Sequence, residues 1–175
     1  MTKQEIIEAL ASNHKAFVDF MDSLNEKDFL FAPSEKWSAS QQLDHIIRAV
    51  SPLAIGLRLP KFVCALFFGK ANRASKDYAG LVKKYQSKLE GGGKAKGRFI
   101  PTVINFKDRK RNINKLLRLI SRLSKNINSF SENELDKYIL PHPLLGKVTV
   151  REMMYFTIYH VQHHQQLAIR NLSIQ

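Results

Sequence analysis

The chain has 175 residues, of which 44% are hydrophobic and 25% are charged, so it is long enough and apolar enough to fold as one globular domain over residues 1–175. Its single cysteine excludes an internal disulfide framework and fits a reducing cytoplasm. Lysine and arginine outnumber aspartate and glutamate by 28 to 15, and this positive charge favours anionic partners. Neither zinc-finger spacing nor an aromatic RNA-binding signature is present, so we expect no specific nucleic-acid partner.

The first quarter of the chain predicts two amphipathic helices. Apolar residues at helical spacing indicate the first helix over residues 3–24, and a proline at position 33 bars its continuation. The second is expected over residues 38–52, where Ser38 or Ser40 would cap the free backbone amides and Trp37 would pack at the helix start. On this helix His45 shares a face with Gln42 and Ala49, between the bulkier apolar positions and solvent.

The middle of the chain, residues 55–102, is less regular. It contains a short apolar run over residues 62–68, a further candidate helix over 75–89 and a glycine-rich, flexible loop over 91–97. The longest apolar region, residues 52–68, is interrupted by Arg58, Pro60 and Lys61, so we expect no membrane span. The length of this stretch permits a long crossover between the second and third long helices, which we include in the predicted fold, although length alone does not decide the connectivity.

Two more long helices are expected in the last third. The helix over residues 106–130 carries an apolar face opposite a basic stripe, which we interpret as a solvated exterior. The helix over residues 149–172 begins at Thr149 with Glu152 three residues later, the pattern of a capping box, after a loop over residues 141–147 that is rich in proline and glycine. Four long helices without an alternating strand pattern predict an all-α fold, a four-helix bundle.

Three of the six histidines lie within five residues of the last helix. His160 and His164 are four residues apart, so successive turns present both imidazoles on the inward face, whereas His163 lies to one side. This spacing suits two neutral imidazoles that bind one divalent metal, although a His160–His163 pair is also geometrically possible and an isolated pair is more often structural. A metal site needs a third ligand, and the candidate is His45 on the second helix.

The remaining histidines have simpler interpretations. His14 faces inward on the first helix, where a buried neutral histidine is favoured over a fourth ligand. His142, between two prolines, is interpreted as a loop residue near the mouth of the site.

Three motifs, in order, carry a family resemblance: Trp37-Ser38-x-x-Gln41-x-x-x-His45, His142-Pro143-x-x-Gly146-x-x-Thr149 and His160-x-x-x-His164-x-x-x-Ala168. With these motifs the chain resembles the DinB-like superfamily, which includes bacillithiol- and mycothiol-dependent transferase-like proteins. The resemblance covers essentially the whole chain and is weakest over residues 55–102. It implies a four-helix bundle, often dimeric, that holds a divalent metal with three histidines. On the matching positions the ligands are His45, His160 and His164.

The resemblance also implies a class of chemistry. Three neutral imidazoles leave a metal its positive charge and an open position, which lowers the pKa of bound water or thiol. We therefore expect a metal-dependent enzyme that transfers a low-molecular-weight thiol to a small-molecule substrate. The alternatives are a metal-dependent hydrolase and a non-catalytic metal-binding or interaction module. Zinc and nickel are the favoured ions, and Arg48 or Lys147 are candidates to hold an anionic thiol.

Overall fold

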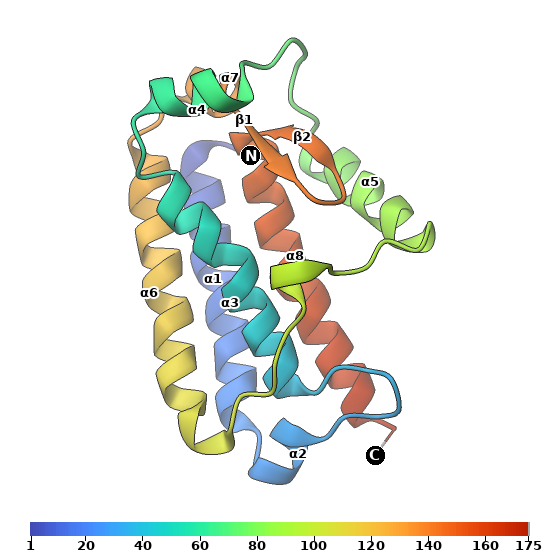
Figure 1. Cartoon of the computed structure of the whole chain (residues 1–175). Coiled ribbons are helices and arrows are strands. Elements are labelled where there is room, and N and C mark those ends of the chain that lie inside the picture. The colour runs from blue at the N-terminus through green and yellow to red at the C-terminus, as the bar shows by residue number, and fades with distance from the viewer. Residues whose placement is uncertain (175) are drawn as a thin grey trace.

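The computed structural model describes residues 1–174, apart from the side chain of Cys64, on which the structure therefore gives no test of any prediction. Its frame is a bundle of four long helices: α1 (Lys3–Ser23), α3 (Ala39–Gly56), α6 (Arg109–Asn128) and α8 (Val150–Leu172). Figure 1 shows that α1 and α8 run in one direction and that α3 and α6 run in the other. Both α1 and α3 pack against α6 and α8. The predicted all-α bundle is confirmed.

Side-chain caps determine where these helices begin. Thr2, Ser38 and Thr149 each accept a hydrogen bond from the backbone N–H three residues later, and the glutamate or glutamine at that position returns a bond to the backbone N–H of the cap residue. These reciprocal bonds satisfy amide donors that have no partner within the helix. The predicted starts at Ser38 and Thr149 are confirmed.

The predicted end of the second long helix at Pro52 is wrong. α3 continues through Pro52 to Gly56, although proline supplies no N–H to the helical ladder. Tertiary contacts beyond the proline support the extra turn: Ala54 is buried in the core, and its carbonyl accepts a hydrogen bond of 3.0 Å from the side chain of Asn126 on α6. Packing against a neighbouring helix therefore outweighs the local cost of the proline.

Because α3 and α6 are parallel, the chain must return from one end of the bundle to the other between them (Figure 1). The predicted crossover is confirmed. It contains α4 (Lys61–Phe68), α5 (Tyr78–Glu90) and the short 3-10 helices η1 (Gly97–Phe99) and η2 (Phe106–Asp108). α5 lies close to the helix predicted over residues 75–89, and α4 is formed by the apolar run. α5 packs against α8 and η1 against α3, so the crossover covers the groove between these two long helices.

A two-stranded hairpin precedes α8 where the sequence predicted only a loop. β1 (Ile139–His142) pairs antiparallel with β2 (Gly146–Thr149), with Ile139 opposite Thr149 and His142 opposite Gly146. Strands of four residues are too short to show an alternating pattern, and Pro141 argues against a strand, which explains the error. The hairpin closes one end of the same groove.

The short helices α2 (Glu26–Leu30) and α7 (Glu132–Lys137) complete the described elements, and the core lies between the four long helices. Within residues 1–174, no single helix is long and apolar enough to cross a bilayer.

Candidate metal centre

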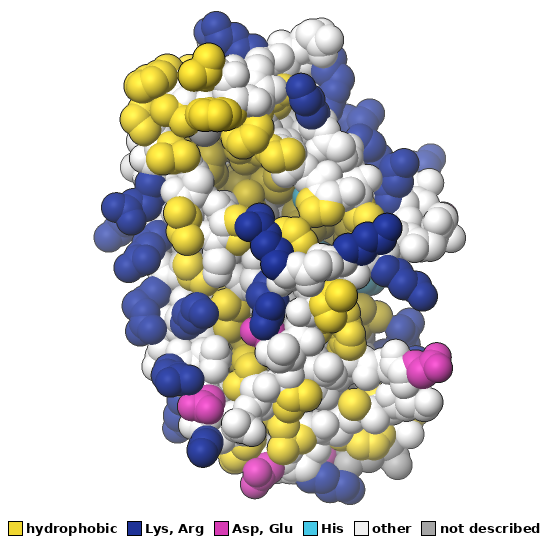
Figure 2. Space-filling model, viewed as in Figure 1, with side chains coloured by type: hydrophobic (Ala, Val, Ile, Leu, Met, Phe, Trp, Pro, Cys, Tyr) yellow, Lys and Arg dark blue, Asp and Glu magenta, His cyan; other side chains and the backbone are white. Residues whose placement is uncertain are grey.

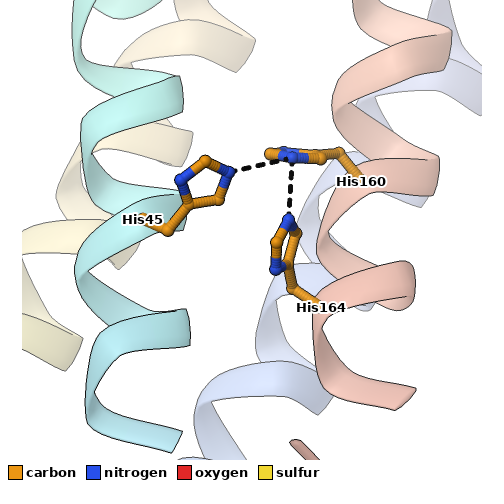
Figure 3. A group of neighbouring side chains, drawn as sticks. All are labelled: His45, His160 and His164. Atoms are coloured by element: carbon orange, nitrogen blue, oxygen red, sulfur yellow. Dashed lines mark hydrogen bonds between the residues drawn. The ribbon is translucent and has the colours of Figure 1, made fainter. Parts of the chain in front are cut away.

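The three histidines that the sequence singles out meet in the centre of the bundle. His45 comes from α3, and His160 and His164 come from successive turns of α8, with their rings turned toward one another in Figure 3. All three side chains are buried. Each histidine offers one ligand atom, and these three atoms all lie within 4.8 Å of one another, so the group could hold a metal ion.

The distances between the ring nitrogens fit ligands that share one ion. Nε2 of His160 lies 3.2 Å from Nε2 of His45 and 3.0 Å from Nε2 of His164. Around a tetrahedral zinc ion with Zn–N distances of about 2.0–2.1 Å, neighbouring ligand nitrogens are about 3.3 Å apart. These two distances therefore need little expansion to accept such an ion.

The outer nitrogens of two rings are held by oxygen atoms. Nδ1 of His45 lies 2.7 Å from the backbone carbonyl oxygen of Phe99, and Nδ1 of His164 contacts the side-chain oxygen of Gln42. Both rings donate at Nδ1, so Nε2 of each carries a lone pair and faces the centre. A partner of this kind orients a metal-binding histidine and selects its tautomer.

The crossover places the Phe99 carbonyl over His45. Arg48, one turn after His45, donates to Asp44, to the backbone oxygen of Arg98 at 3.2 Å and to the hydroxyl of Thr102 at 3.2 Å. The Asp44 carboxylate also accepts a hydrogen bond of 2.7 Å from the backbone N–H of Thr102. This network ties the segment around η1 to α3, which holds the carbonyl in place.

Burial keeps the three imidazoles neutral. It lowers the pKa of His160 and of His164 well below the usual value, and the neighbouring histidines lower both further. Burial also lowers the pKa of His45, against a smaller opposing effect of the hydrogen bond to Phe99. Neutral rings have the lone pairs that metal binding requires at neutral pH.

Aromatic side chains surround the histidine cluster. Trp37 stacks on His164, with ring centroids 6.1 Å apart, and also lies 5.0 Å from the His45 ring. Its backbone oxygen accepts a hydrogen bond from Asn171 of α8, so it links the start of α3 to the end of α8, as predicted for an anchoring residue. Tyr85 of α5 contacts His160 edge-on, and burial raises the pKa of its hydroxyl, which therefore stays protonated.

A cavity of about 760 Å³ adjoins the histidine cluster. It lies between α3 and α8 under the crossover and the hairpin, and its walls are mostly apolar, with Leu53, Phe68 and Leu140 among them. This volume matches the clefts that bind small molecules. The face of α3 that the sequence placed between the bulkier apolar positions and solvent, with Gln42 and Ala49 beside His45, lines this cavity together with Leu53.

The rim of the cavity is basic, and one acidic residue, Glu35, is among its lining residues. The lining cations are Lys36, Lys94, Lys96, Arg98 and Arg170. Neither Arg48 nor Lys147, the candidates from sequence position, is a lining residue: Arg48 is engaged with Asp44 and the crossover, and Lys147 points to the backbone oxygen of Phe68.

The other three histidines differ from the central group. His163 is half-buried on the cavity wall, where its ring stacks on Tyr159 and meets Tyr85 edge-on. His14 is buried on α1 with Nδ1 2.8 Å from the Leu10 carbonyl, and burial lowers its pKa to about 4, as expected for a neutral core histidine. His142 lines the cavity and caps the hairpin turn, because its Nδ1 accepts hydrogen bonds from two backbone N–H groups.

The fold and this cluster define a class: an all-α bundle with three buried histidines that could hold a metal ion beside a cavity. The family model of the DinB superfamily matches residues 9–168, which is most of the chain. The chain therefore belongs to the DinB superfamily. No curated protein matches it.

Sequence reasoning singled out the three histidines but did not predict which side chains and backbone groups contact their rings. Gln42 lies three residues before His45 on the same face, so its spacing was a usable signal. Tyr85 and Leu81 are four apart on the buried face of α5, a weaker signal of the same kind. The carbonyl of Phe99 and the stacking of Trp37 depend on where the crossover and the start of α3 fold, which no local pattern indicates.

Proposed function

We propose that this chain is a divalent-metal-dependent enzyme whose ligands are His45, His160 and His164. The observation that carries the proposal is the arrangement of lone pairs. Nε2 of His45 and Nε2 of His164 both face Nε2 of His160. Nε2 of His160 carries at most one proton, so it can donate a hydrogen bond to only one of the two facing lone pairs. A cation at the centre would satisfy all three nitrogens at once. Zinc and nickel both accept three imidazoles, so the proposal covers either ion.

A divalent ion held there would act as a Lewis acid that lowers the pKa of a bound thiol or water toward neutrality. The chain itself supplies the orientation. Gln42 and the Phe99 carbonyl fix two of the rings, and Trp37 covers them from one side. The walls of the cavity beside the cluster are mostly apolar.

The reaction that we favour is transfer of a low-molecular-weight thiol. The basic rim supports an anionic thiol, because Lys94, Lys96 and Arg170 can hold a carboxylate or phosphate at the mouth while the sulfur reaches the histidines. The apolar wall suits an electrophilic small molecule. In the reaction the thiol releases its proton to solvent, its sulfur forms a bond to the electrophilic carbon, and the leaving group departs with the electrons of the bond that breaks.

Hydrolysis is the second candidate, and His163 is the observation that favours it. This ring lies on the cavity wall beside the cluster, and burial lowers its pKa, so it is neutral at pH 7 and can accept a proton from water. Replacing His163 by glutamine would then abolish activity, whereas thiol transfer would survive the change.

The test combines metal analysis with a substrate screen. The purified protein, loaded separately with zinc and with nickel, is assayed against electrophiles with and without anionic thiols. Thiol-dependent consumption of an electrophile supports the transferase. Thiol-independent cleavage of an ester or amide that requires His163 supports the hydrolase. Metal binding without either activity would leave a non-catalytic metal-binding module and would overturn the enzymatic proposal.

A further inference from the structure

An exposed apolar cluster covers the end of the bundle where α3 ends and α4 begins. Phe62, Leu66 and Phe67 of α4 keep 69%, 77% and 73% of their surface exposed. Ile55 at the end of α3 and Leu59 in the connection to α4 are exposed beside them in the sequence. We call these five residues the α4 patch. Figure 2 shows apolar side chains gathered at this end of the molecule.

The outward direction of the patch is built into the fold. α4 contacts β1, and Nζ of Lys61, at its first turn, donates to the Glu134 carboxylate at 2.6 Å and to the Ser129 backbone oxygen at 2.8 Å. On the other side of the helix, Phe68 lines the cavity beside the histidine cluster. With one side held against the bundle, Phe62 and Leu66, four residues apart, point away from it.

Positive charge surrounds this patch. Arg58 and Lys125 line a shallow depression together with Leu59, and neither makes an ion pair within the described chain. Acidic side chains at the same end are engaged in ion pairs: Glu134 with Lys61, and Glu132 and Asp136 both with Arg151. On the face that Figure 2 shows, acidic side chains lie in the lower half, away from the patch.

We propose that the α4 patch docks this protein onto the surface of an anionic phospholipid bilayer. An interfacial segment of this type combines aromatic and aliphatic side chains, which enter the acyl boundary to a depth of about 5–10 Å, with flanking lysine and arginine that meet lipid phosphates. The patch supplies the first element and Arg58 and Lys125 supply the second. The formal net charge of +13 adds a general attraction to an anionic surface.

Charge complementarity favours the bilayer over a second copy of the chain. A dimer formed through the patch would bring Arg58 and Lys125 of both copies close together, and like charges in an interface oppose association. An anionic bilayer would neutralise the same residues. The docking surface is separate from the histidine cluster, so the inference does not depend on the proposed enzymatic activity.

The test is cosedimentation of the full chain with vesicles of phosphatidylcholine, either pure or with about one-third phosphatidylglycerol. We expect binding to the anionic vesicles only, with a loss of most binding at about 0.5 M salt. The double variant Phe62→Ser and Phe67→Ser should weaken binding about tenfold or more, because two exposed side chains that enter the bilayer are lost. The control is Val103→Ser with Ile174→Ser, two apolar residues outside the patch that are 58% and 56% exposed, and this variant should bind like the wild type.

A second pair of variants separates the basic residues from charge in general. Arg58→Gln with Lys125→Gln should weaken binding several-fold, whereas Lys83→Gln with Lys88→Gln, which removes the same charge from α5, should have a smaller effect. Absence of binding to anionic vesicles would overturn the proposal. So would equal weakening by both charge pairs. A third result would also contradict it: light scattering shows that the wild type is a dimer and that the Phe62→Ser and Phe67→Ser variant is a monomer, while both proteins bind vesicles equally.

Discussion

α8 carries two buried polar clusters, and they differ in how completely their hydrogen bonds are satisfied. At the start of the helix Glu152, fully buried, accepts from the Arg73 guanidinium at 2.6 and 2.8 Å and from the backbone N–H groups of Lys76 and Thr149. Two and three turns further on, His160 and His164 meet His45 with two lone pairs directed at one nitrogen. The first cluster matches donors with acceptors, and the second has more acceptors than donors.

This difference separates a structural cluster from a binding site. A saturated buried network holds elements together and offers nothing to a ligand. An excess of lone pairs in a buried pocket costs free energy unless a cation or a proton donor completes it. We therefore interpret the network at Glu152 as the structural support of α8 and the histidine cluster as its functional end. The predictions below test this division.

The largest expected effect comes from breaking the saturated cluster. Glu152→Ala removes the acceptor of four hydrogen bonds and the capping box of α8, which should lower the free energy of unfolding by about 4 kcal/mol. Urea denaturation of the metal-free protein measures this change. Glu8→Ala, on the exposed face of α1, is the control and should change stability by less than about 0.5 kcal/mol. A mild effect of Glu152→Ala would contradict the structural role.

A smaller effect concerns stability at acid pH and comes from His14, which is buried in the core of the bundle and belongs to neither cluster. Because burial lowers the pKa of His14 to about 4, the unfolded chain binds this proton more readily, and stability falls as the pH drops below about 6.5. Between pH 7 and pH 5 the loss is about 2 kcal/mol. His14→Leu should remove that part of the pH dependence. Unfolding curves at both pH values provide the measurement, and an unchanged pH dependence in the variant would refute the assignment.

The support of the histidine cluster gives the next effect. Gln42→Ala removes the oxygen that holds Nδ1 of His164, which should weaken metal binding about tenfold or more while the fold remains intact. Trp37, the only tryptophan, stacks on His164, so its fluorescence reports the titration. Gln166→Ala, at an exposed position of α8, is the control and should bind metal like the wild type. Equal affinities of the Gln42 variant and the control would remove Gln42 from the site.

The smallest effect belongs to the rim. Lys94→Gln with Lys96→Gln should raise the KM of an anionic thiol about threefold to tenfold and leave kcat unchanged, because these residues hold charge at the mouth and lie away from the reacting sulfur. A neutral thiol should show no change. Lys83→Gln with Lys88→Gln, which removes the same charge from α5, provides a control for the loss of charge. An equal effect on both thiols would argue against a charge-selective rim.

Only part of the histidine cluster could be predicted from local spacing, because His45 lies 115 residues from His160 along the chain and is joined to the pair through the family resemblance. His160 and His164 share a face of any regular helix, and the Thr149 capping box sets where that helix begins. The hairpin and the turn of α3 beyond Pro52 were missed because packing against distant segments stabilises them. The same holds for the Phe99 carbonyl, which lies 54 residues from His45 along the chain and is placed by the Arg48 and Asp44 contacts. Such long-range supports leave no periodic pattern in the sequence.

The central claim, that the cluster with excess lone pairs binds one metal ion, is tested most directly by elemental analysis of three proteins. The wild type, His45→Ala and His163→Ala are purified identically, loaded with zinc and passed through a desalting column, with circular dichroism to verify that each is folded. We predict one ion per chain in the wild type and in His163→Ala, and almost none in His45→Ala, because two imidazoles from one helix hold the ion weakly. Retention of the metal in folded His45→Ala together with its loss in His163→Ala would contradict the account.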